Sequence, residues 1–496
     1  MARLLLVLAL YGAVAMVHAD PRSLREFCLQ GAVDLGVRGQ GLHPSSGQTH
    51  PARWCVIAEP GSGRVYFSSD AAINADVREE FAQAYPDSRS VRIVNAQHPP
   101  DLAFVDVDAT SEAARYRRIV PAVLVSELAE HPEWRVEGAA EGWQRVLYPG
   151  SDLPVDLRVV NGRLHTLRAM ADLPLRGRVG VDWHWDWADG SAADPRRLRI
   201  EIGGEVFLRA EVDVSDLSAE ESQGIWLPSG GQTPVEIPGE HWPSRVAPRL
   251  LELEPGVFQV RNVRTGFHHL VVDTEDGLVV ADAPAGWVEL AQIPPADLVP
   301  GLGISGLSER LVDFLRQHFP QRPIRAVALT HAHDDHAGGA RAFAAEEASV
   351  YAPAATAAFL QASLNAASMP ADRLSERGLE LRVQPVEQRL RLDDARRPLE
   401  LWSLGANPHV EAMLGVWLPE QRIFFQSDLH MPNPGTTAPA ESRAGSECWF
   451  ASWAIKHLPA DARVMSSHAA ALTARQQLES WLSSPLCESS RAAHSE

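Results

Sequence analysis

Potential metal ligands are concentrated in one short stretch, residues 330–339, which reads Thr-His-Ala-His-Asp-Asp-His-Ala-Gly-Gly. Imidazole nitrogens and carboxylate oxygens are ligands for zinc and related transition metals. His331 and His333 lie two residues apart, so in an extended backbone their side chains point the same way and can share one ion. Asp335 and His336 follow where the chain turns, which directs them to a neighbouring position for a second ion. The alternative is a solvated polar loop, but this density and spacing of histidines argue against it.

A predicted strand must position these ligands. Residues 324–329, Ile-Arg-Ala-Val-Ala-Leu, form a short apolar run typical of a buried strand that leads directly into the stretch. Gly338 and Gly339 come after it and permit a tight backbone at the start of the next helix. The ligands are therefore expected at the end of a rigid strand.

The stretch resembles the characteristic motif of the metallo-β-lactamase superfamily, and the chain from about Leu250 to Leu482 resembles that family throughout. The resemblance implies an α/β fold, an αββα sandwich, in the C-terminal half. It also implies three further ligands in the order His, Asp, His at three separate strand ends. The candidates are His409, Asp428 and His468, which follow the strand-like segments 399–404, 422–426 and 463–466.

The resemblance also implies how the ligands are shared. His331, His333 and His409 would hold one metal, and Asp335, His336 and His468 the other, with Asp428 bridging. The expected cofactor is two Zn²⁺ per chain, with Fe or Mn as alternatives, because N/O ligation alone does not fix the metal. A metal-bound hydroxide would be the nucleophile, with Asp335 as the catalytic residue that orients it.

Departures from the family pattern narrow the range of reactions expected of this predicted enzyme. True metallo-β-lactamases typically carry Cys or Ser at the position of Asp428, so a bridging Asp favours the glyoxalase II and lactonase side. The expected substrate is a small molecule with an ester, thioester, lactone or phosphoester bond. Three alternatives remain: a mononuclear iron oxidoreductase similar to persulfide dioxygenases, a β-lactam hydrolase, and a non-enzymatic zinc-stabilised binding protein.

Several nearby residues are candidates for supporting roles. Asp282 stands where the superfamily usually has an Asp-Thr-Gly-like turn, and we expect it to support the metal loop through hydrogen bonds. His430 and the loop 431–446 are candidates for lining the substrate pocket, with a plain surface loop as the alternative. His268 and His269 lie on a predicted early strand and are interpreted as core or pocket residues rather than ligands.

The N-terminal half, residues 20–227, contains no catalytic motif. Short alternating segments predict a β-rich α+β domain with one helix at 74–85. In 182–187, Asp-Trp-His-Trp-Asp-Trp, tryptophans occupy one face of a strand and Asp182, His184 and Asp186 the other. A carbohydrate platform or a second metal site is possible there, but packing tryptophans are favoured. A Pro/Gly-rich linker is predicted at 228–249, before a catalytic domain at 250–482 and a polar tail at 483–496.

The predicted compartment is the periplasm or the exterior. Residues 1–19 resemble a cleavable signal peptide, with Arg3 before the apolar segment 4–17 and no later segment as apolar as a membrane span, so no stable membrane insertion is expected. The simplest disulfide pairing of the four cysteines is Cys28 with Cys55 and Cys448 with Cys487, and free buried thiols are the alternative. The net charge of −19 disfavours nucleic acid as a partner.

Overall fold

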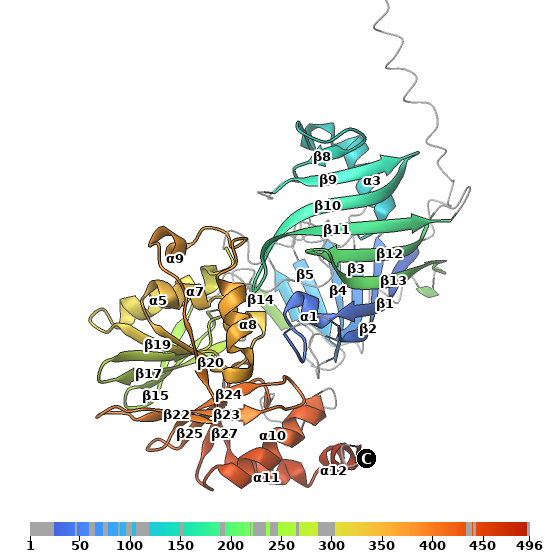
Figure 1. Cartoon of the computed structure of the whole chain (residues 1–496). Coiled ribbons are helices and arrows are strands. Elements are labelled where there is room, and N and C mark those ends of the chain that lie inside the picture. Colours follow the sequence, from blue (N-terminus) through green and yellow to red (C-terminus); the bar gives the residue numbers. More distant parts are fainter. Residues whose placement is uncertain are drawn as a thin grey trace, which may run out of the picture.

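The computed structural model describes residues 24–44, 47–58, 65–72, 78–87, 90–95, 102–105, 119–148, 153–188, 194–218, 220–221, 235–238, 247–263, 267–285, 303–432, 439 and 443–493. The predicted signal peptide and most of the predicted linker lie outside these residues. The described residues form three sheets, one in the N-terminal half and two in the C-terminal half (Figure 1).

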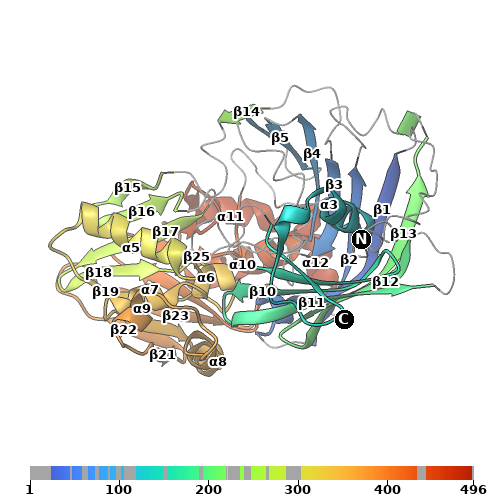
Figure 2. The ribbon, with the colours of Figure 1, turned by 90° about the horizontal axis from the view of Figure 1, so that it is seen from above.

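The N-terminal sheet has the strand order β14-β6-β5-β4-β3-β2-β1-β13-β12-β11-β10-β9-β8-β7 among the described residues. Its pairings are antiparallel except for β14 with β6. The sheet curves strongly around helix α3 when it is seen from above (Figure 2). The elements of this half are β1 (Arg25–Asp34), α1 (Leu35–Arg38), β2 (Thr49–Ala58), β3 (Val65–Ala72), β4 (Arg78–Asp87), β5 (Ser90–Asn95), β6 (Leu102–Val105), α3 (Pro121–Glu130), η1 (Pro132–Trp134), β7 (Arg135–Val136), β8 (Gln144–Val146), β9 (Val155–Val160), β10 (Arg163–Leu173), β11 (Gly177–Trp187), β12 (Pro195–Ile202), β13 (Glu205–Asp216) and β14 (Val235–Pro238).

One sequence prediction fails in this half. The helix expected at 74–85 is wrong, because residues 78–87 form strand β4, hydrogen-bonded between β3 and β5. Residues rich in Glu, Ala and Gln favour a helix locally, but pairing on both sides overrides that preference. Part of the predicted linker is also structured, since β14 adds a parallel strand to the sheet beside β6.

The tryptophan-rich strand packs as expected. Trp183 and Trp185 are each 4% exposed and belong to the N-terminal core, and the partly buried Trp187 packs against it. On the opposite face, Asp182 pairs with Arg168 at 2.9 Å. His184 and Glu201 lie near Asp182, close enough for the three to share an ion, but all three are only half-buried. The tryptophans are therefore core residues of this sheet.

The C-terminal half contains the αββα sandwich that the sequence predicts. Its first sheet has the order β15 to β21 and its second the order β22 to β27 within the described chain. The elements are β15 (Arg249–Glu254), β16 (Val257–Arg261), β17 (His268–Thr274), β18 (Gly277–Ala281), α5 (Gly306–His318), β19 (Ile324–Ala328), α6 (Asp334–Ala337), α7 (Ala340–Ala345), β20 (Ser349–Pro353), α8 (Ala354–Leu364), α9 (Arg373–Glu376), β21 (Val383–Val386), β22 (Arg389–Leu392), β23 (Leu399–Gly405), β24 (Met413–Leu418), β25 (Ile423–Ser427), α10 (Ala444–His457), β26 (Arg463–Ser466), β27 (Thr473–Ala474), α11 (Arg475–Leu482) and α12 (Pro485–Ala493).

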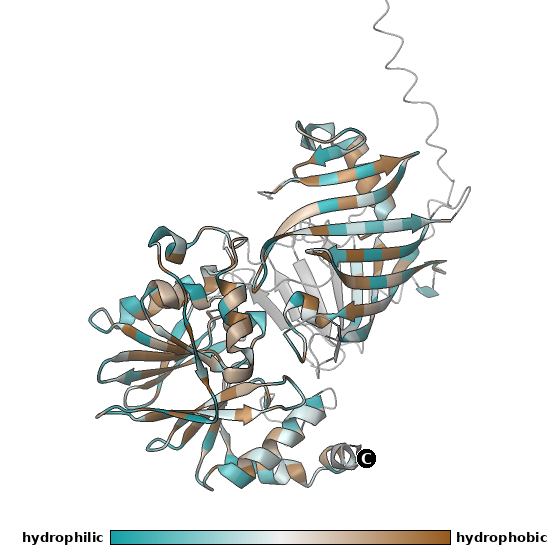
Figure 3. Ribbon diagram, viewed as in Figure 1, coloured by the Kyte–Doolittle hydropathy of each residue, from teal (hydrophilic) through white to brown (hydrophobic). Residues whose placement is uncertain are grey.

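Three apolar layers hold the sandwich together. Alternate residues of β18 show the pattern, because Val279 and Ala281 face the second sheet whereas Leu278 and Val280 face the helices. Helices α5, α7 and α8 cover the outer face of the first sheet, and α10 and α11 cover the second. The apolar segments on the strands and on the covering helices are visible in Figure 3. Burial on both sheet faces accounts for the continuously apolar strands.

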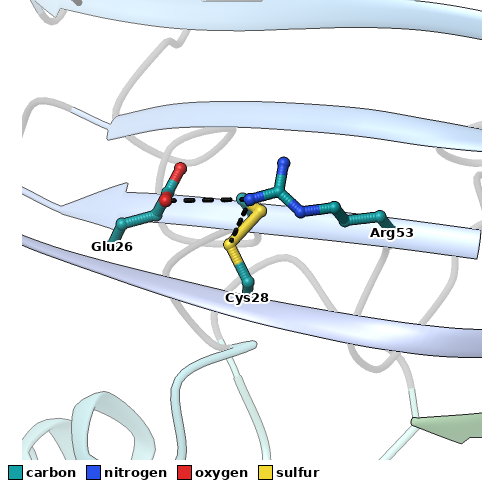
Figure 4. The surroundings of a disulfide bond; sticks show 4 residues. Glu26, Cys28 and Arg53 are labelled. Carbon is teal, nitrogen blue, oxygen red and sulfur yellow. Dashed lines mark hydrogen bonds and ion pairs between the residues drawn. A yellow bond between two sulfur atoms is a disulfide. The ribbon is translucent and has the colours of Figure 1, made fainter. Parts of the chain in front are cut away.

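Both disulfides form with the predicted pairing. Cys28 and Cys55 lie directly opposite each other on β1 and β2, with their Cα atoms 4.1 Å apart. Figure 4 shows Arg53 beside this bond, where it donates to Cys28 Sγ at 3.2 Å and lies 3.8 Å from Glu26. Cys448 on α10 bonds Cys487 on α12, so part of the predicted polar tail is a helix tied to the sandwich. Among the described helices, none is long and apolar enough to span a membrane.

The tip of the β10–β11 hairpin docks on the C-terminal half. Leu175 is 3% exposed and packs in the core of the first sheet and its helices. Arg178 donates its backbone N–H to the carbonyl of Ser368 at 2.6 Å, and the Ser368 hydroxyl donates to the carbonyl of Arg176 at 2.9 Å. Figures 1 and 2 both show the hairpin pointing from the N-terminal sheet toward α7 and α8. The two halves are thus in direct contact.

Candidate metal centre

The seven predicted ligands come together at the ends of four strands of the sandwich. The segment after β19 carries His331, His333, Asp335 and His336, the last two in α6. The other three follow β23, β25 and β26, one each: His409, Asp428 and His468. The positions at the strand ends explain why residues so far apart in sequence meet at one place.

Their nitrogen and oxygen atoms form two separate groups that could each hold an ion, His331 with His333 and His409, and Asp335 with His336 and His468. A third group, His331 with His336 and Asp428, overlaps both. Asp428 lies between the two groups. Its Oδ2 is 3.6 Å from His409 Nε2, 3.1 Å from His336 Nε2 and 3.4 Å from His468 Nε2. The assignment of these residues to two metal ions stays a prediction.

One buried carboxylate organises the loops behind these ligands. Asp282 accepts hydrogen bonds at Oδ1 from the Thr330 backbone N–H at 2.9 Å and the Thr330 hydroxyl at 2.7 Å. At Oδ2 it lies 2.9 Å from His336 Nδ1 and 3.1 Å from the hydroxyls of Ser427 and Ser467. Asp282 thus connects the segments after β18, β19, β25 and β26, and its bond to Nδ1 leaves Nε2 of His336 to face the other ligands.

Burial and charge set the protonation states that ligands need. Burial, with His336 nearby, holds the pKa of His331 well below its usual value, and burial also lowers the pKa of His333 to about 3. Burial alone would raise the pKa of Asp428, but His336 and His468 hold it well below the usual range. Burial likewise opposes a charged His336, yet Asp428, Asp335 and Asp282 keep its pKa well above normal. Two neutral histidines and an ionised carboxylate are suited to ligation, and the carboxylates favour positive charge at the centre.

One buried ring nitrogen tests whether a metal ion fits. Among the described residues, Nδ1 of His333 has no hydrogen-bond partner although it is buried. The same histidine uses its other nitrogen, since Nε2 lies 3.1 Å from the Gly41 carbonyl. A buried polar atom without a partner is costly. The donor set therefore fits a metal ion that would accept the lone pair of His333 Nδ1.

The N-terminal half contributes to the same site. Gln40 is 1% exposed, and its side-chain amide donates to Asp334 Oδ1 and, at 2.9 Å, to Asp335 Oδ1. Sequence reasoning missed Gln40 and Gly41, because they lie almost 300 residues before the ligands they contact. No local pattern around Gln40 distinguishes it from any other polar residue.

The remaining candidate histidines are buried in the core. His269 donates from Nδ1 to the Ala281 carbonyl at 3.0 Å, and burial lowers its pKa to about 4. Burial also lowers the pKa of His268 to about 3. His430 was expected to line a pocket, but its side chain is completely buried against Phe450 and Trp481, with Nε2 3.0 Å from the Thr473 hydroxyl. Its position is that of a core residue, with an aromatic ring on each of two sides.

Residues 300–439 match the family model of the metallo-beta-lactamase superfamily. Solved structures similar to the chain include a metallo-beta-lactamase from Pontibacter korlensis, with 20% identity and a TM-score of 0.32, covering 47% of this chain and 96% of that one. They also include TMB-1, with 17% identity and a TM-score of 0.34, covering 50% and 99% of the two chains. A third is the sec-alkylsulfatase Pisa1 from Pseudomonas sp., with 17% identity and a TM-score of 0.32, covering 47% and 40%.

No curated protein matches the chain. Structural similarity at these TM-scores does not support a family by itself. The family is supported by the model matched at residues 300–439, within the half of the chain that has the αββα architecture. The prediction of an enzyme domain from this superfamily is confirmed at that level. Residues 300–439 of this chain therefore belong to a domain of the metallo-beta-lactamase superfamily.

Proposed function

We propose that this chain is an exported, dinuclear metal-dependent hydrolase that cleaves an ester, thioester, lactone or phosphoester in a small molecule. The observation that carries the proposal is the position of Asp428 Oδ2 between two complete ligand groups, within 3.1–3.6 Å of one histidine nitrogen of the first and two of the second. A mononuclear iron enzyme would need only one of these groups. The two disulfides support an oxidising compartment.

The site has an open side, which favours catalysis over a structural metal. Six of the seven ligands are buried, whereas the His468 side chain is 25% exposed. Substrate would enter beside His468, where Phe267 packs edge-on against the imidazole with ring centroids 5.0 Å apart. A non-enzymatic zinc protein would instead be expected to enclose its ligands completely.

The residues of the chain would divide the work. Two bound metal ions would lower the pKa of a water toward ~7 and polarise the bond to be cleaved. Asp335 presents Oδ2 to the centre, 3.5 Å from His336 Nε2 and 3.9 Å from His468 Nε2. It can therefore orient the attacking water by accepting a hydrogen bond from it. Asp282 keeps His336 in place while charge moves during the reaction.

The first experiment is elemental analysis of the purified full chain, with assays on chromogenic esters, thioesters, lactones, phosphodiesters and a cephalosporin. We expect about two metal ions per chain and hydrolysis of one class other than the cephalosporin. His333→Ala should abolish hydrolysis, whereas His318→Ala, at an exposed histidine of α5, should not. One iron per chain with an inactive panel would contradict the proposal and favour the oxidoreductase. Hydrolysis of the cephalosporin alone would identify a β-lactam hydrolase.

A further inference from the structure

One segment of the N-terminal half, Gly39–His43, reaches two of the four loops that carry candidate ligands, those after β19 and β23. It leaves the short helix α1, which Asp34 caps by accepting the Gly36 N–H at 3.0 Å. Gly39 has φ +91°, a left-handed conformation that ends the helix and redirects the chain. Its carbonyl accepts the N–H of Asp334 at 3.1 Å, and the carbonyl of Leu42 accepts the N–H of Glu411 at 2.9 Å. The segment thus spans from α6 to the loop that carries His409.

The Gln40 side chain fixes the orientation of a predicted ligand. Its amide donates to Oδ1 of Asp335, whereas the histidines of the second ligand group face Oδ2 of the same carboxylate. An amide donor on Oδ1 holds the carboxylate plane so that Oδ2 stays directed at the centre. The second donation, to Asp334 Oδ1, holds the adjacent turn of α6. Because Gln40 is almost fully buried, its amide has no solvent to exchange these bonds with.

The Gly41 carbonyl selects which nitrogen of His333 faces the centre. It lies 3.1 Å from Nε2, so Nε2 carries the proton and donates it, which leaves the lone pair on Nδ1. Nδ1 is the nitrogen that makes no hydrogen bond in the structure. Only glycine fits at this position, because a Cβ on residue 41 would lie 2.8 Å from the His43 carbonyl oxygen and 2.9 Å from the Gly36 nitrogen. The carbonyl is therefore held by tight backbone packing.

We propose that the N-terminal half completes the metal centre, with Gln40 as the positioning residue of Asp335 and the Gly41 carbonyl as that of His333. This inference rests on the proposed metal-dependent function. It assigns a role to a half of the chain that carries no catalytic motif, and it makes that half a part of the active site. Contacts of this kind typically affect metal affinity by about 10–100-fold.

Gln40 and the Gly41 carbonyl contact different ligand groups, so replacing each one should weaken a different Zn²⁺ site. Gln40→Met keeps the length of the side chain but removes the N–H donor, so it should weaken Zn²⁺ binding by the group with Asp335. Gly41→Ala displaces the carbonyl, so it should weaken the group with His333. Ser368→Ala is the matched control, because it removes a hydrogen bond between the halves, to the Arg176 carbonyl, without contacting either ligand loop.

The experiment measures Zn²⁺ affinity of the full chain by competition with a chromophoric chelator, together with melting temperatures of the metal-free and Zn²⁺-loaded forms. We expect one of the two sites to weaken about 10–100-fold in Gln40→Met and the other in Gly41→Ala. Ser368→Ala should lower both melting temperatures equally and leave both affinities unchanged. A smaller stabilisation by Zn²⁺ in the first two variants separates positioning from a loss of folding.

Each other outcome has a definite meaning. If wild type binds two Zn²⁺ and Gln40→Met and Gly41→Ala bind both with unchanged affinity, the inference is wrong and the proposed function stands. If all three variants lose affinity to the same extent, the segment acts only as a general contact between the halves, and the inference is again wrong. If wild type binds no metal, the proposed function itself fails.

Discussion

Asp282 Oδ2 lies 2.9 Å from Nδ1 of His336, and neither side chain is exposed to solvent. The same carboxylate binds Thr330 at the end of β19. Asp282 adopts φ +67°, a left-handed conformation in which Asn is among the few residues tolerated besides Gly. The backbone conformation at residue 282 therefore limits which side chains can occupy the position that hydrogen-bonds to the ligand loops.

Asp282→Asn should lower metal affinity by about 10–100-fold with little change in backbone strain. Asn tolerates the left-handed conformation, so the variant removes the charge that holds His336 and leaves an amide that would have to face a donor. Zn²⁺ competition titration measures the change. Asp276→Asn, in the exposed turn between β17 and β18, is the control and should bind metal as wild type does. Equal affinity in Asp282→Asn would show that the carboxylate is not needed.

Gly177→Ala should separate the β10–β11 hairpin from the C-terminal half. Gly177 has φ +74°, and a Cβ there would lie 2.6 Å from the Ser368 carbonyl carbon and oxygen. Gly162→Ala is a matched control, since Gly162 has nearly the same φ, +73°, and no atom of the described residues lies within 4 Å of its Cβ position. Hydrogen exchange should increase at residues 174–178 in the first variant alone. Equal effects of the two substitutions would mean that only backbone strain matters there.

Acid should weaken one ion pair that ties α7 to α9. Arg341 donates to both carboxylate oxygens of Asp372, at 2.6 and 2.7 Å. Burial alone would raise the pKa of Asp372, but the bonds from Arg341 and the Ser375 N–H hold it below the usual value. A carboxyl with a lowered folded pKa stabilises the fold above its unfolded pKa of about 4 and loses this contribution as pH falls through the folded pKa.

Asp372→Asn should therefore be less stable than wild type at pH 7, and the gap in melting temperature should close as the pH falls from 5 to 3. Calorimetry of both proteins across this pH range measures the gap. Because all other carboxylates are present in both proteins, their pH dependence cancels in the difference between the two melting temperatures. The exposed Asp393→Asn is the control and should show no such gap. A gap that stays constant down to pH 3 would contradict this prediction.

Loss of the Cys448–Cys487 bond should release α12 from the sandwich. Cys487 is fully buried, and the bond closes a loop of 39 residues, which in the chain-entropy model corresponds to about 3–4 kcal/mol. The double variant Cys448→Ser and Cys487→Ser should unfold at a lower guanidinium concentration than wild type. Limited proteolysis should cleave first near residues 483–493. Unchanged stability would show that α12 is held by its packing alone.

The sandwich, and the meeting of the candidate ligands at its strand ends, could be predicted because the sequence signals for them are local. Each ligand follows a short apolar strand, and His331, His333, Asp335 and His336 are consecutive or nearly so. Strand periodicity also placed Trp183 and Trp185 in the core. A buried strand end leaves few possible positions for the residue that follows it. A local sequence pattern therefore indicates where in the fold that residue lies.

The failures come from long-range contacts. Residues 78–87 favour a helix by composition, but hydrogen bonds from β3 and β5 decide the strand. Gln40 contacts Asp335 across 295 positions in sequence, and no periodicity or spacing connects them. His430 shows the same limitation, because the rings of Phe450 and Trp481 that enclose it come from two separate helices. These features depend on how the elements pack, which their sequences alone do not determine.

The contact between Gln40 and α6 also suggests an order for folding and metal binding. Because the two partners are almost 300 residues apart, closing this contact costs more chain entropy than closing any hairpin of either half. The ligand loops would reach their final hydrogen bonding only after both halves have folded. Tight metal binding would then be a late step of maturation, reached once the two halves are in contact.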